Sequence, residues 1–290
     1  MKLYLDHNVY IKCLNDKDLK NFVIDECARK KIQILYSPAH IEETYQVEMK
    51  KESPYSAKAP ELRGIIDEIT NSTEILPTMT ELIIRHERTR DVYRRVKGID
   101  TRQTVENDSL ERFRIDKENY SRMRKEDKHN LSIPVLSPAE IWEHPKIKEQ
   151  IDHFNANSEY IVRQYNSSPR VVFPLMVLGV DKTLPADLRL SRGNYSTRLK
   201  HSFNELEYTI EILMRILNFC GYREEKEAKT AISSTHDTTH CIYATAADVM
   251  IAMDKNFAIK SEAVYHFLGV GTQVKFCSNI EELRAAVAEL

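Results

Sequence analysis

Short apolar runs alternate with amphipathic segments at the start of the chain. KLYL at 2–5 and IQILY at 32–36 have the pattern of buried strands. Over 16–30 and 39–51, apolar residues recur at helical spacing. Strands that alternate with helices predict an α/β protein with a parallel sheet.

The same alternation continues to about residue 97. The pattern predicts a loop over 51–60, a helix over 61–69, a short strand over 72–76 and a charged helix over 80–96. From about residue 98 to residue 200 the alternation disappears, and charge-dense stretches are followed by segments interrupted by proline. We interpret 98–200 as a mostly helical insertion.

After the insertion the alternation returns. A strong amphipathic pattern over 202–222 predicts a helix that stops at Gly221. The rest predicts, in order, a helix over 234–246, a strand over 248–253, a helix over 256–269, a strand over 273–277 and a final helix capped by Ser278. The α/β part is therefore discontinuous, with one piece over 1–97 and the other over 201–290.

Composition narrows the class of protein. The 290 residues are 42% hydrophobic and carry a net charge of −2, so any nucleic-acid surface has to be a local patch. Five cysteines without CxxC spacing indicate reduced thiols rather than disulfides or a zinc ribbon. No apolar run predicts a signal peptide or a membrane span. We expect a cytoplasmic protein with no membrane partner.

Acidic residues mark the ends of two predicted strands. Asp6 follows KLYL, and Asp254 follows DVMIAM. In a parallel sheet, the carboxyl ends of strands meet at one edge, where ligands bind. Glu43 lies on the helix after the second strand, and Asp237 is placed at the start of the helix before the Asp254 strand. Four clustered carboxylates repel each other unless a cation such as Mg²⁺ or Mn²⁺ lies between them.

These segments resemble the motifs of PIN-domain nucleases. The resemblance is carried by YLDHNVYI, YSPAHIEE, STEILP and HDTTHCIYATAADVMIAMDKNF. It covers about 1–97 and 201–290, and not the insertion. It implies a three-layer α/β/α fold with a central parallel five-stranded sheet in the order 3-2-1-4-5. One position departs from the pattern, because Ala252 stands where the family usually has threonine or serine.

The resemblance also implies an activity, a divalent-metal-dependent endoribonuclease. Asp6, Glu43, Asp237 and Asp254 would be its catalytic residues and its Mg²⁺ or Mn²⁺ ligands. Each has a simpler reading as well: Asp6 alone would be an ordinary strand-end residue or helix cap.

Other residues are candidates for supporting roles. Asn8 would orient Asp6 or cap the next helix, Ser37 would cap the helix that carries Glu43, and His236 would reach a scissile phosphate. Residues 85–128 hold 14 Lys/Arg against 10 Asp/Glu, which is either a solvated helical face or a clamp for an RNA backbone. The cations predicted to bind substrate are Arg94, Arg95, Lys97 and Arg102.

The sequence leaves the substrate open. We expect RNA, such as tRNA or mRNA, as the partner and substrate. A DNA-directed or structure-specific nuclease is the alternative within the same chemistry. A catalytically degenerate regulatory protein that binds RNA or protein through the insertion is the alternative from another class. A homo-oligomer or an inhibitory protein partner is compatible with each of these.

Overall fold

The computed structural model describes most of the chain. The described residues are 1–49, 56–78, 80–97, 136–167, 184–186, 188–223 and 228–290, with isolated positions between 111 and 133 and with the backbone alone at 228–235. Arg102 and a large part of the 98–200 insertion lie outside them.

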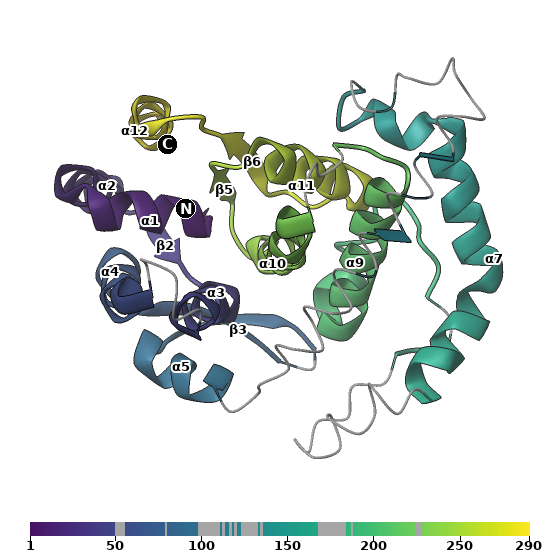
Figure 1. Cartoon of the computed structure of the whole chain (residues 1–290), viewed down its shortest axis with the longest axis horizontal. Coiled ribbons are helices and arrows are strands. Elements are labelled where there is room, and N and C mark those ends of the chain that lie inside the picture. Colours follow the sequence, from purple (N-terminus) through teal and green to yellow (C-terminus); the bar gives the residue numbers. More distant parts are fainter. Residues whose placement is uncertain are drawn as a thin grey trace.

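Four parallel strands form the centre of the protein. β1 (Lys2–Leu5), β2 (Gln33–Leu35), β5 (Val249–Ala252) and β6 (Gln273–Phe276) pair in the order β2-β1-β5-β6 (Figure 1). The central strands β1 and β5 are almost entirely buried, as strands covered on both faces require. The expected mixed α/β class with a mostly parallel sheet is thereby confirmed.

A two-stranded antiparallel sheet lies beside β2. It consists of β3 (Thr73–Pro77) and β4 (Leu82–His86). One parallel bridge, between Tyr36 and Glu74, joins β3 to the end of β2. The third predicted strand therefore has its expected neighbour, but the continuous parallel ladder contains four strands and not five.

The charged helix predicted over 80–96 is wrong in its first half. Thr78 and Glu81 close a tight turn, in which the Thr78 backbone N–H donates to the Glu81 carbonyl at 2.8 Å. This turn folds Leu82–His86 back onto β3, and the helix α5 (Thr89–Lys97) begins only afterwards. Pairing with β3 therefore overrides the helical spacing of the charged residues.

Helices cover both faces of the sheet. Leu3 and Leu5 belong to one hydrophobic cluster, and Tyr4 belongs to the other, as the alternation of a strand requires. The first cluster includes residues from α1 (His7–Asn15), α2 (Lys17–Arg29), α4 (Ala59–Thr70) and α12 (Ile280–Glu289). The second includes residues from α9 (Phe203–Phe219), α10 (Ala228–Ala244) and α11 (Lys255–Leu268). The helix α3 (Pro38–Met49) follows β2 and begins at the predicted proline.

The described part of the insertion packs onto this body. It contains the short helix η3 (Glu140–Glu143) and the long helix α7 (Pro145–Ser167), which lies beside α9 (Figure 1). Trp142 is fully buried, its Nε1–H donates to the Ala263 carbonyl at 2.8 Å, and its ring lies 4.7 Å from that of Phe267. The insertion thus shares one hydrophobic cluster with the sheet residue Tyr4.

Two predicted helix starts are corrected. α10 begins at Ala228, so Asp237 lies within the helix rather than at its start. α12 is capped by Asn279, whose Oδ1 accepts from the backbone of Glu282, and not by Ser278. In the part of the chain that the structure describes, no helix is both long enough and apolar enough to cross a lipid bilayer.

Candidate functional site

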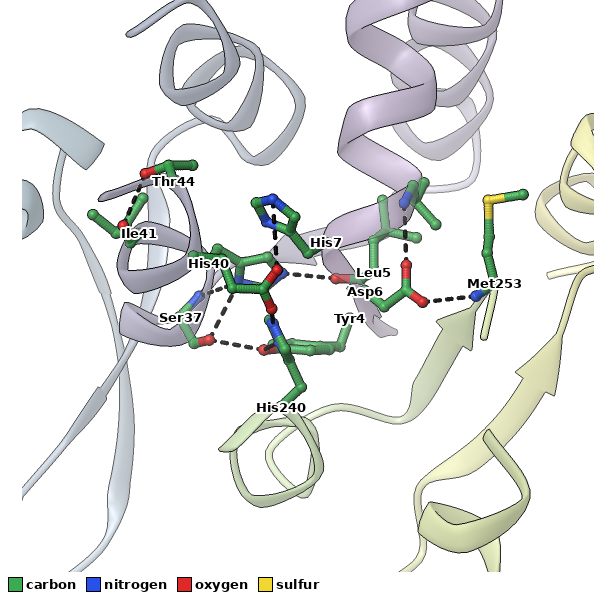
Figure 2. A network of polar contacts seen from close by, with 12 residues as sticks. Tyr4, Leu5, Asp6, His7, Ser37, His40, Ile41, Thr44, His240 and Met253 are labelled. Carbon is green, nitrogen blue, oxygen red and sulfur yellow. Dashed lines mark hydrogen bonds and ion pairs between the residues drawn. The ribbon is translucent and has the colours of Figure 1, made fainter. Parts of the chain in front are cut away.

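Asp6 connects the ends of two strands, β1 and β5, at the carboxyl edge of the sheet. Its carboxylate accepts from the backbone N–H of Val9 at 3.1 Å, which caps α1, and from that of Met253 at 2.7 Å (Figure 2). The side chain is buried, and this burial raises the pKa of Asp6 to about 6, although the two N–H groups oppose the shift. Asp6 therefore joins β1 to the end of β5, 247 residues away along the chain.

Glu43 lies nearby between two histidines. His240 Nε2 lies 2.7 Å from Glu43 Oε1, and His7 Nε2 lies 3.6 Å from Glu43 Oε2. Burial disfavours the charged form, but His7, His240 and His236 outweigh it and hold the pKa of the Glu43 carboxyl well below its usual range. Because 21% of its side chain is exposed, Glu43 is an ionised group that solvent can reach.

A chain of buried hydrogen bonds holds His240 on the side of the ring away from Glu43. Tyr4 Oη lies 2.6 Å from His240 Nδ1 and 2.7 Å from Ser37 Oγ (Figure 2). Burial raises the pKa of Tyr4 well above its ordinary value, so its hydroxyl keeps a proton to donate. The order Ser37–Tyr4–His240–Glu43 links the start of α3 to a carboxylate one and a half turns further along the same helix.

His40 supports the same cluster through both ring nitrogens. Its Nε2 lies 2.8 Å from the Leu5 carbonyl, which can only accept, so Nε2 carries the proton. Its Nδ1 then accepts from the backbone N–H of Ser37 at 3.0 Å. Burial, assisted by His240, places the pKa of His40 well below its usual value, which matches a neutral structural ring.

His7 is the member of the cluster that these bonds leave out. Its side chain is 6% exposed, and among the described residues neither ring nitrogen has a hydrogen-bond partner. Burial lowers the pKa of His7, and the Glu43 carboxylate opposes that shift. His7 is therefore a buried imidazole beside an ionised carboxylate.

The other two predicted acids lie at the start of α11 and within α10. Asp254 follows Met253 at the same sheet edge, but it is exposed and caps α11 through a bond from the Phe257 N–H at 2.8 Å. Asp237 is half-buried within α10. Among the described side chains, no three of the His, Cys, Asp or Glu type converge to hold a metal ion. The dependence on Mg²⁺ or Mn²⁺ that the resemblance implies stays a prediction.

Some of the predicted supporting residues belong to the cluster around Glu43, and one is exposed. Ser37 and His236 are buried, and the bonds of Ser37 and the effect of His236 on Glu43 connect both to the cluster. Asn8 is exposed on α1. The sequence interpretation missed Tyr4, His7, His40 and His240 as site residues. The signal for His40 was its place in YSPAHIEE, three residues after Ser37 and three before Glu43.

Three of the predicted substrate-binding cations, Arg94, Arg95 and Lys97, lie on α5, which packs against the helix α3 that carries Glu43. Arg94 and Lys97 are exposed, and Arg94 Nη1 lies 3.0 Å from Asp91 Oδ1. Arg95 is engaged differently, because its Nη2 lies 2.6 Å from Oε1 of the fully buried Glu74. Arg95 therefore stabilises β3, whereas Arg94 and Lys97 face solvent.

No protein-family model, curated protein or solved structure matches the chain. The likeness to PIN-domain nucleases therefore rests on the quoted motifs alone.

Proposed function

We propose that the chain is a ribonuclease that cleaves phosphodiester bonds at the Asp6–Glu43 edge of the sheet. The observation that carries the proposal is the meeting of Glu43 with His240, 197 residues away, at the carboxyl edge of a parallel sheet. That edge is where open α/β sheets bind their ligands. The four quoted motifs add support for a nuclease.

The polar cluster has the groups that such a reaction needs. Glu43 can accept a hydrogen bond from an attacking water and take up the proton that the water releases. The water oxygen then forms a bond to phosphorus while the bond to the leaving oxygen breaks, and that oxygen leaves with the electron pair and takes a proton from solvent. The imidazoles around Glu43 also offset its negative charge, which would otherwise repel a phosphodiester.

A cleavage assay tests this proposal. Labelled single-stranded RNA, tRNA and DNA are incubated with the wild type, with Glu43→Gln and with Glu42→Gln, a matched control on the same helix. We expect RNA cleavage by the wild type, a loss of about 100-fold or more in Glu43→Gln, and little change in Glu42→Gln. Cleavage that survives Glu43→Gln would remove this site from the proposal. A wild type that cleaves DNA alone, or nothing, would overturn the ribonuclease assignment.

The same assay tests the metal expectation. The resemblance implies dependence on Mg²⁺ or Mn²⁺, whereas the described side chains provide no ready cation site. Cleavage that stops in EDTA and returns with Mg²⁺ or Mn²⁺ would show that the carboxylates rearrange around an ion. Cleavage that continues in EDTA would assign the chemistry to the Glu43–histidine cluster itself.

A further inference from the structure

The described residues provide no hydrogen-bond partner for the His7 ring. Both ring nitrogens are buried without a hydrogen-bond partner among the described residues, and the 3.6 Å separation from Glu43 is too long for such a bond. An unpaired buried polar group destabilises the folded state, and native structures rarely keep one without a reason. A group from outside the protein is therefore expected to complete it.

Two other imidazoles of the cluster, His40 and His240, contrast with His7. His40 and His240 each use both ring nitrogens in bonds of 3.0 Å or less. His7 lies between α1 and α3, close to His40, with their ring centroids 6.5 Å apart (Figure 2). Both nitrogens of His40 and of His240 therefore have partners, whereas neither nitrogen of His7 has one among the described residues.

The backbone holds His7 in this place. His7 is the first residue of α1, and Asp6 caps that helix while it also binds Met253. The two bonds to Asp6 fix the direction in which the chain enters the helix. The imidazole is therefore held beside the carboxylate of Glu43, whose side chain is partly exposed.

From this geometry, we propose that His7 contacts the substrate by donating a hydrogen bond to a non-bridging oxygen of the scissile phosphodiester. A neutral imidazole has one N–H to donate, and a phosphodiester oxygen is an acceptor. In this position His7 binds the phosphate beside the Glu43 carboxylate, which holds the attacking water. This assignment rests on the proposed ribonuclease function.

The decisive variant is His7→Phe, which keeps a ring but removes both nitrogens. Replacing an unpaired buried polar group with an apolar one of similar shape is neutral or stabilising. We therefore expect an unchanged or higher melting temperature together with RNA cleavage reduced by about 100-fold. His7→Gln, which restores an N–H donor, should recover part of the activity. His266→Phe, at an exposed histidine on α11, is the control and should remain fully active.

A binding measurement separates substrate contact from other roles. In a Glu43→Gln background, which prevents cleavage, addition of His7→Phe should weaken the binding of a short single-stranded RNA by about tenfold. A clear fall in melting temperature in His7→Phe would overturn the inference, because it would show that the ring is needed for folding. So would full activity or unchanged RNA binding.

Failure of the inference can be distinguished from failure of the proposed function. If the wild type cleaves RNA and Glu43→Gln does not, while His7→Phe is fully active, only the role of His7 is wrong. If the wild type cleaves no RNA, the proposed function is wrong, and the role assigned to His7 is wrong with it.

Discussion

Replacing Tyr4 with phenylalanine should destabilise the protein and disturb the site together. The Tyr4 hydroxyl is fully buried and bonds to Ser37 and His240 at 2.7 and 2.6 Å. Tyr4→Phe removes one oxygen and changes little of the packing. The Ser37 hydroxyl still has His40 Nδ1 at 3.2 Å, but His240 Nδ1 loses its bond to Tyr4.

The expected magnitude follows from that single orphaned nitrogen. A buried acceptor without a partner costs about 1–3 kcal/mol, so we expect a loss of about 2 kcal/mol in the free energy of unfolding. In a chain of this size, this corresponds to a melting temperature lower by about 3 °C. Because His240 orients Glu43, RNA cleavage should also fall by roughly tenfold.

Tyr10→Phe is a matched control for this experiment. Tyr10 is also fully buried, but its hydroxyl makes one long bond, to the Leu35 carbonyl at 3.4 Å. Its replacement should cost less than about 1 kcal/mol in urea denaturation followed by circular dichroism. In a His240→Phe background, Tyr4→Phe should lose most of its effect, because the shared bond is already absent.

Equal stability and equal activity of Tyr4→Phe and Tyr10→Phe would refute the role assigned to the Tyr4 hydroxyl. An equal effect of Tyr4→Phe in the presence and absence of His240 would refute the coupling between the two side chains.

Three further predictions concern stability. The pKa of Asp6 is raised from 3.8 to about 6, so between these pH values the folded state binds more protons than the unfolded state. The free energy of unfolding of the wild type relative to Asp6→Asn should therefore fall by about 3 kcal/mol as the pH rises from about 4 to 7. Denaturation curves in which the difference in free energy between the two proteins stays constant with pH would contradict this prediction. Glu74→Gln weakens the bonds of a fully buried carboxylate to Arg85 and Arg95 and should cost about 2 kcal/mol in urea denaturation, whereas Glu81→Gln at an exposed position should cost almost nothing. Trp142 is the only tryptophan and is buried against α11, so its fluorescence should change in the same thermal transition as the circular dichroism; an earlier fluorescence transition would show that the insertion undocks first.

Local patterns determined most of the elements of this protein. The buried runs at 2–5, 32–36 and 248–253 became parallel strands because short apolar segments next to amphipathic helices have few other ways to bury their surface. Gly269 ends α11 as predicted, since its φ of 74° lies in the left-handed region that favours glycine. The position of Asp6 at a strand end could be read from its neighbours in the same way.

The partners of those residues were decided only by the tertiary structure. Residues 82–86 carry no local mark that separates a strand from a helix, and the turn that pairs them with β3 settled the outcome. Tyr4 looked like a core residue, yet its hydroxyl meets His240, 236 residues away. Hydrophobic periodicity reports which face of an element is buried, but not which polar atom will lie opposite another after folding. The Glu43–histidine cluster depends on such long-range contacts, whereas the sheet edge that holds it follows from local pattern.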